Sequence, residues 1–209
     1  MDSRVFLCYN ITMFSQRQQL LIFTALVIFV ALVIAFIFYA PNNPRVLFWQ
    51  KIDNGDLSCV SEQKPEIVRG SSLSGILEDG SEITLLVGYY NCNEVKRDDL
   101  AVYQYAGSPD PIIKVIKGLP GDIFSLKLAE NGQRRISVNN QEIKNSTGEF
   151  YELSEARSKM LALYEKDYGG VIPVNSFLIL GNKADGTLDS IRFGLVDKSG
   201  FLGKAVIKK

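Results

Sequence analysis

The chain has 209 residues, of which 46% are hydrophobic and 22% charged, a composition typical of a folded protein. Its 23 Lys and Arg residues balance 23 Asp and Glu residues without a long basic run, which argues against a nucleic-acid partner. The chain contains no histidine, so Ser-His-Asp and Cys-His proteases and most zinc sites are excluded. A hydrolase built on this chain must take its general base from Lys, Asp, Glu or a chain terminus.

The first long feature is an uncharged apolar segment at residues 20–40, LLIFTALVIFVALVIAFIFYA. At ~1.5 Å per residue, a helix of this length spans a hydrocarbon core of about 30 Å. A cleaved signal peptide has a shorter apolar core and a small residue where this chain has Phe38, so the segment is interpreted as an uncleaved membrane anchor. The flanking charges favour only weakly the orientation that places residues 1–19 in the cytoplasm.

A linker at 41–56, rich in Pro and Asn at its start, separates the anchor from a part that is mainly β. Short β-branched and aromatic runs between turn formers predict strands at 83–89, 100–105, 112–116, 123–128, 176–180 and 203–207. An insertion at about 129–172 is expected to hold a hairpin, at 135–138 and 142–143, and a helix at 154–166 with Ser154 as its cap. The sequence therefore predicts a β-rich domain at 57–209 with a small α/β insertion, preceded by one transmembrane helix.

The three cysteines, Cys8, Cys59 and Cys92, form no CxxC pair and give no support to a zinc cluster. Cys8 lies on the other side of the apolar segment from Cys59 and Cys92. If the C-terminal part is outside the cytoplasm, Cys59 and Cys92 can form a disulfide. Spacing alone leaves two free thiols equally open.

Three segments carry residues suited to catalysis. Residues 68–80 are small, polar and flexible, so they can expose a serine hydroxyl. Lys114 and Lys117 lie three apart in an apolar strand and therefore point to opposite faces; the inward one loses hydration, which lowers its pKa and frees the amine to act as a base. Residues 180–190 offer hydroxyls and carboxylates that can orient an amine. Each segment alone also fits an ordinary surface loop or a pair of solvated lysines.

Together, and in this order behind an anchor, the segments resemble the type I signal peptidases. The family patterns Gly-x-Ser-Met-x-Pro-Thr-Leu, Lys-Arg-x-x-Gly-Leu-Pro-Gly-Asp and Gly-Asp-Asn-x-x-x-Ser-x-Asp-Ser-Arg-x-x-Gly correspond to residues 70–77, 114–122 and 181–194. Gly-Leu-Pro-Gly-Asp at 118–122 is the most specific match. The resemblance implies a β-rich signal-peptidase-like catalytic domain.

The resemblance also implies a Ser/Lys dyad in which Ser72 is the nucleophile and Lys114 the general base. The Lys114 amine must be neutral, so burial has to depress its pKa. Thr187 is expected to hold the amine through a hydrogen bond, with Asp189 and Ser190 bracing that loop. The backbone N–H of Ser72 is expected to hold part of the oxyanion, without the hydroxyl that some family members carry at the position of Gly70.

By the same resemblance the protein is a membrane-bound serine endopeptidase that cleaves signal peptides from exported preproteins. It is expected in the bacterial plasma membrane, with its catalytic domain outside the cytoplasm and its partners the preproteins and the lipid bilayer. The cleavage site would lie extended along a strand edge, with small residues before the cut in shallow pockets. No metal or organic cofactor is needed.

Departures from the family patterns bear on activity more than on fold. Gly75 in place of Pro is expected to loosen the nucleophile loop, and Asn182 replaces an Asp. Ile191 in place of Arg removes a salt-bridge partner for Asp189, for which the neighbouring Arg192 is a candidate substitute. Two alternatives stay open. Peptidases that process pilins in bacterial conjugation share the dyad, the anchor and a similar size, and the substitutions motivate an inactive membrane-tethered β-domain that binds peptides.

Overall fold

The computed structural model describes residues 22, 24–31 and 55–207. Residues 24–31 are helical and fall within the predicted anchor at 20–40; the remainder of the anchor, apart from residue 22, and most of the predicted linker lie outside the described residues. Within the described ranges, no helix combines the length and the apolar character needed to cross a membrane. The chain divides into two units, residues 1–50 and 51–209, and the second holds both sheets.

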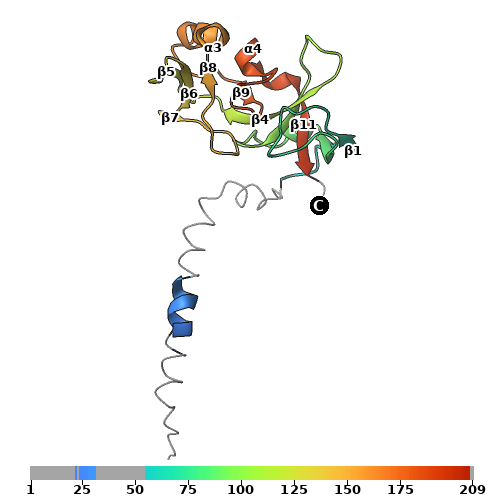
Figure 1. Ribbon diagram of the computed structural model, residues 1–209. Coiled ribbons are helices and arrows are strands. Elements are labelled where there is room, and N and C mark those ends of the chain that lie inside the picture. The colour runs from blue at the N-terminus through green and yellow to red at the C-terminus, as the bar shows by residue number, and fades with distance from the viewer. Residues whose placement is uncertain (1–21, 23, 32–54, 208–209) are drawn as a thin grey trace, which may run out of the picture. The chain divides into compact units, whose positions relative to one another are not determined.

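The larger sheet has seven antiparallel strands in the order β1-β2-β11-β3-β4-β9-β10 (Figure 1). Its strands are β1 (Glu62–Ile67), β2 (Glu82–Val87), β3 (Leu100–Tyr103), β4 (Ile112–Gly118), β9 (Ser176–Leu180), β10 (Val196–Asp197) and β11 (Phe201–Ile207). The predicted strands at 83–89, 100–105, 112–116, 176–180 and 203–207 are confirmed, with shifted ends. The first of them stops at Val87, because Gly88 turns the chain into the 3-10 helix η1 (Tyr89–Asn91). The mainly β class is therefore confirmed.

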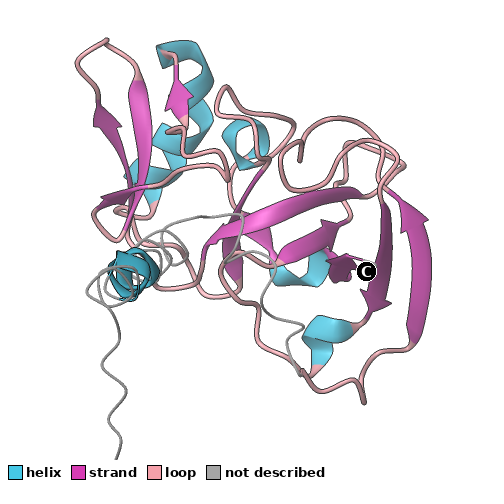
Figure 2. Ribbon diagram, turned by 60° about the horizontal axis from the view of Figure 1, so that its bottom comes forward, coloured by secondary structure: helices cyan, strands magenta, loops and turns pink. Residues whose placement is uncertain are grey.

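A smaller sheet and one long helix form a second lobe at one end of the described domain, away from β1 and β11 (Figures 1 and 2). It contains β5 (Phe124–Leu128), β6 (Arg134–Val138), β7 (Gln141–Glu142), β8 (Glu152–Leu153) and α3 (Glu155–Asp167). The predicted hairpin and helix are confirmed, and Ser154 caps α3 by accepting from the Arg157 N–H. The small sheet already starts with β5, so this lobe begins before residue 129.

β1 was not predicted, because its sequence EQKPEI is charged and contains a proline. Every β1 residue except Glu66 is exposed, so the strand exists through its ladder with β2 and not through burial. Pro65 pairs with Thr84 and is tolerated because β1 is an edge strand with one neighbour in the sheet. The strand matters for function because it leads directly into the loop that carries Ser72.

Apolar side chains beside the predicted site residues are anchored in the cores of the domain. Leu73 and Val115, which directly follow Ser72 and Lys114 in sequence, belong to one buried cluster and are 1% and 0% exposed. Ile191, close to Asp189 in sequence, belongs to the cluster that fills the small lobe. Well-packed neighbours restrict the backbone, so the polar residues between them are held in defined positions.

Candidate active site

Ser72 lies in the loop between β1 and β2, and this loop is closed by its own hydrogen bonds. The Gly70 N–H donates to Asp79 Oδ1 at 2.7 Å, and the N–H groups of Ile76 and Leu77 both donate to the Leu73 carbonyl at 2.9 Å. The Leu73 side chain is buried while Ser72 stays partly exposed. The loop therefore presents a hydroxyl on a backbone that is fixed from inside.

Lys114 lies on β4, where it pairs with Ala101 of β3, and its side chain is only 3% exposed. Its Nζ donates hydrogen bonds to Ser72 Oγ at 2.8 Å and to the Ile113 carbonyl at 3.0 Å. Lys117 instead forms an ion pair with Asp98 at 2.7 Å. The structure thus brings together the two residues that the sequence singles out as nucleophile and base.

Burial controls the protonation of Lys114. It lowers the pKa of the Lys114 amine to about 8, because a charged amine loses hydration inside the domain, while the negative charge of Asp189 acts in the opposite direction. The usual lysine pKa lies near 10.4, so the neutral amine is far more accessible here than on an ordinary surface lysine. This is the condition that a lysine base requires.

Asp189 is fully buried and holds together the loop that follows β9. Its Oδ2 accepts from the Gly181 N–H at 2.9 Å and from Thr187 Oγ1 at 2.6 Å, and its Oδ1 accepts from the Ile191 N–H at 3.0 Å. Burial raises the pKa of the Asp189 carboxyl, and these donors counter that rise. Ser190 Oγ accepts from the Ile179 N–H at 2.9 Å, which fixes the start of α4 (Ser190–Phe193) to β9.

Two expectations about this loop differ from the structure. Thr187 donates to Asp189, and among the described residues the Lys114 amine donates to Ser72 and Ile113, so the predicted Thr187–Lys114 hydrogen bond is absent. Arg192 is exposed and does not replace the missing partner of the buried Asp189, which is satisfied by backbone N–H groups and a hydroxyl instead. Ile191 packs into the small-lobe core at 2% exposure.

Comparison with known proteins identifies the family. A model of the family described as "Signal peptidase, peptidase S26" matches residues 16–208. The chain belongs to this family of signal peptidases. It is 26% identical over 151 residues to Signal peptidase IB of Staphylococcus aureus strain COL, covering 67% of this chain and 74% of the relative. Membership makes it a serine endopeptidase of the signal peptidase I type.

Two further similarities fall in the same family. Signal peptidase I of Bacillus licheniformis is 27% identical over 145 residues, which cover 67% of this chain and 73% of that protein. Among solved structures, a signal peptidase I from Enterococcus faecalis is 17% identical and overlaps 54% of this chain and 97% of the other. The TM-score between the two structures is 0.33.

Gly75, which stands where the family pattern has a proline, forms a turn in the loop that carries Ser72. Gly75 has a positive φ of 90°, a conformation closed to proline, and its N–H donates to Glu78 Oε1 at 2.8 Å. The residue forms a defined turn that depends on glycine. That the loop is looser than one with a proline stays a prediction.

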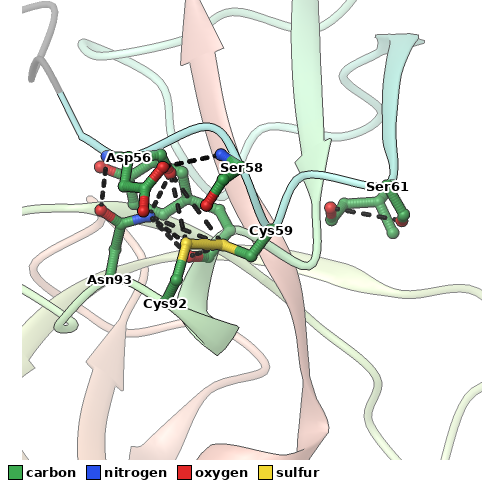
Figure 3. The surroundings of a disulfide bond; sticks show 8 residues. Asp56, Ser58, Cys59, Ser61, Cys92 and Asn93 are labelled. Carbon is green, nitrogen blue, oxygen red and sulfur yellow. Dashed lines mark hydrogen bonds between the residues drawn. A yellow bond between two sulfur atoms is a disulfide. The ribbon is translucent and has the colours of Figure 1, made fainter.

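Cys59 and Cys92 form a disulfide in the structure, with Cα atoms 5.8 Å apart (Figure 3). The bridge ties the segment before β1 to the segment after η1, and it encloses the whole loop that carries Ser72. Asn93 reinforces it: its Oδ1 accepts from the Asp56 N–H at 2.9 Å, and its Nδ2 donates to the Asp56 carbonyl at 2.7 Å. The closed segment stabilises the start of the domain, at the end of the β1–β2 pair opposite to the loop that carries Ser72.

No local pattern indicated the small-lobe residues that form hydrogen bonds with the loop after β9. Ser146 and Asn145 lie in a polar turn between β7 and β8, and both form hydrogen bonds with Asn182, 36 and 37 positions away. Tyr151 also donates to the Gly181 carbonyl at 2.6 Å. Such contacts depend on how the two lobes pack, and a local pattern cannot predict them.

Proposed function

We propose that this protein is a membrane-bound serine endopeptidase that cleaves signal peptides from exported preproteins with Ser72 and Lys114 as a catalytic dyad. The observation that carries the proposal is the 2.8 Å contact between Lys114 Nζ and Ser72 Oγ inside a site where the pKa of the lysine falls to about 8. When the amine is neutral, the same contact lets the Ser72 hydroxyl donate its proton to the lysine nitrogen.

In the first half of the reaction, Ser72 Oγ attacks the carbonyl carbon of the scissile peptide bond while Lys114 takes the hydroxyl proton. The carbonyl oxygen becomes an oxyanion, for which the backbone N–H of Ser72 is a donor. Within the described part of the chain this N–H has no hydrogen-bond acceptor, which supports the role. The intermediate collapses, the peptide C–N bond breaks, and Lys114 returns the proton to the leaving amine, leaving an ester on Ser72.

In the second half, the neutral Lys114 takes a proton from a water molecule that attacks this ester. The C–O bond to Ser72 breaks, the serine recovers its proton from Lys114, and the signal peptide leaves with a free carboxylate. Asp189, Thr187 and Ser190 act indirectly, because they fix the loop after β9 through the N–H groups of Gly181 and Ile179. Asp189 also attracts the protonated amine through its charge.

The backbone edges near Ser72 fit an extended substrate. β1 has β2 as its one neighbour, and β4 pairs with β9 only from Val115 onward, so Ile112–Lys114 have no partner on that side within the described chain. A peptide can add to such edges through main-chain hydrogen bonds. This arrangement supports cleavage of an extended segment.

The proposal places the protein in the bacterial plasma membrane, anchored by residues 20–40, with residues 1–19 in the cytoplasm and residues 57–209 outside. The apolar segment is long enough to span a bilayer, which supports the anchor. The Cys59–Cys92 disulfide suits an oxidising compartment, which supports the orientation. The lipid bilayer and exported preproteins are the proposed partners, and no metal or organic cofactor enters the reaction.

The test is cleavage of a purified preprotein by the full-length protein in liposomes, compared with the Ser72→Ala variant. We expect the wild type to release a signal peptide of defined length and the variant to release none. A pilin precursor tested in parallel distinguishes the conjugation-type alternative, which would favour that substrate. Binding of the preprotein without cleavage by the wild type would support the inactive peptide-binding alternative and contradict the proposal.

A further inference from the structure

Asn182 joins the nucleophile loop to the small lobe, and the proposed mechanism gives it no role. The residue follows β9 and is 3% exposed. Its backbone N–H donates to the Ser72 carbonyl at 2.7 Å, and its side-chain Nδ2 donates to the Ser74 carbonyl, also at 2.7 Å. The backbone on both sides of Leu73 is therefore bound by one residue.

The other contacts of Asn182 reach the turn between β7 and β8. Its Oδ1 accepts from the Ser146 N–H at 2.8 Å, its Nδ2 donates to Ser146 Oγ at 2.6 Å, and its carbonyl accepts from Asn145 Nδ2 at 3.1 Å. Asn145 also stabilises the turn between β7 and β8, because its Oδ1 accepts from the N–H groups of Thr147 and Glu149 at 3.0 and 2.9 Å. Asn182 is thus held by a rigid support on the small lobe.

We propose that Asn182 is a positioning residue for the nucleophile. It fixes the Ser72–Ser74 backbone against the turn at 145–149, so that Ser72 Oγ stays in line with Lys114 Nζ. The inference rests on the proposed Ser/Lys function. Its physical basis is that misplacement of a reacting group by about 1 Å lowers the rate by about 10²-fold. The buried Leu73 side chain holds the same stretch from the core side.

Gly75 and Asn182 both depart from the family patterns, and both contribute to the contacts around Ser74. The Ser74 carbonyl needs a donor, which the amide of Asn182 supplies and an ionised Asp cannot, since a carboxylate would place one oxygen against another. Glycine at position 75 provides space for the side chains of Asn182 and Ser146. A Cβ at that position would lie 3.0 Å from Asn182 Nδ2 and 3.3 Å from Ser146 Oγ. Asn182 therefore supplies the donor for the Ser74 carbonyl, and Gly75 keeps a Cβ from crowding that donor.

The test uses full-length protein in liposomes and the isosteric variant Asn182→Asp. The turnover number and KM are measured at alkaline pH, where Lys114 is fully neutral, so that a change in its pKa does not affect the comparison. We expect kcat to fall at least about tenfold while KM stays within about twofold, because the substrate-binding edges are untouched. The folded fraction, followed by thermal unfolding, is expected to stay high.

Two further variants separate positioning from general loosening of the turn. Ser146→Ala removes one acceptor of Asn182 but keeps the backbone N–H that binds its Oδ1, and we expect kcat to fall about threefold. Thr147→Ala removes a hydroxyl that bonds Asn145 and Glu149 without touching Asn182, and we expect kcat to stay within twofold. Should Asn182→Asp fail to fold, the comparison of Ser146→Ala with Thr147→Ala still tests whether Asn182 positions Ser72.

The outcomes also separate this inference from the proposed function. If Ser72→Ala is inactive but Asn182→Asp keeps kcat within twofold, or loses kcat only in proportion to its folded fraction, the positioning role is wrong and the dyad stands. Equal losses in Ser146→Ala and Thr147→Ala would likewise overturn the role of Asn182. If Ser72→Ala itself remains active, the dyad is wrong.

Discussion

Lys114 Nζ and Ser72 Oγ lie 2.8 Å apart, although the two residues are separated by 42 positions and come from a strand and a loop at different places in the chain. The contact exists because Leu73 and Val115, the next residues in sequence, are buried in the same apolar cluster. Packing therefore brings a hydroxyl against an amine that is shielded from water.

Replacing Ser72 by alanine removes the atom that would form the bond to the substrate. We expect Ser72→Ala to lower kcat by about 10⁴-fold or more, with the preprotein still bound, because the backbone edges remain. The matched control is Ser71→Ala: the Ser71 hydroxyl is exposed, accepts from Lys183 at 2.7 Å, and is not expected to matter for turnover. If Ser72→Ala keeps its turnover and Ser71→Ala loses it, Ser71 is the nucleophile.

Replacing Lys114 by arginine keeps a positive charge but removes the proposed base, since a guanidinium stays protonated at all relevant pH values. We expect Lys114→Arg to be inactive in the same cleavage assay. Lys117→Arg is the control, because Lys117 pairs with Asp98 at the surface and an arginine can form the same ion pair. Full activity of Lys114→Arg would show that another group removes the proton.

The depressed pKa of Lys114 also predicts an effect on stability. The folded pKa is about 8 against an ordinary value of 10.5, so the unfolded chain binds the proton more tightly and folding is penalised below pH 8 by on the order of 3 kcal/mol. The penalty fades as the pH rises from 8 to 10.5. Lys114→Met loses about 1 kcal/mol of hydrogen bonding but escapes the penalty.

Lys114→Met is therefore expected to be more stable than the wild type by about 1–3 kcal/mol at pH 7, and this advantage should vanish by about pH 10. Denaturant unfolding of both proteins at the two pH values measures it. A variant that is less stable than the wild type at pH 7, or a difference that does not change with pH, would mean that the folded protein accommodates the charged amine without cost.

The Cys59–Cys92 bridge predicts a second stability effect. The two cysteines are 33 positions apart, and closing a loop of that length contributes about 3–4 kcal/mol to the free energy of unfolding in the chain-entropy model. Cys59→Ser should therefore lower the melting temperature by about 10 °C. Cys8→Ser is the control, since Cys8 takes no part in this bridge. Identical melting curves with and without a thiol reductant would contradict the contribution.

Local patterns predicted the strands and the helix whose residues are themselves apolar or capped. β4 (IIKVIKG) and α3, with Ser154 before it, follow from composition and capping alone. β1 could not be predicted, because EQKPEI becomes a strand only through pairing with β2. Tertiary pairing overrides local propensity there.

The candidate site shows the same division between local and long-range information. Ser72 and Lys114 come from segments whose character is visible in the sequence, whereas the partners of Asp189 and Asn182 are not. Thr187 lies two residues from Asp189 and bonds it instead of the lysine, and Asn182 finds its partners 36 positions away. Which neighbour a buried polar group selects is decided by packing, which a linear pattern does not contain.

The most direct test of the dyad is the pH dependence of single-turnover cleavage by the wild type, under conditions in which chemistry limits the rate. We expect a rate that rises tenfold per pH unit at acidic and neutral pH, bends at an apparent pKa of about 8, and is level above it, because only the neutral Lys114 can accept the Ser72 proton. A rate that is flat between pH 6 and 10 would contradict a lysine base.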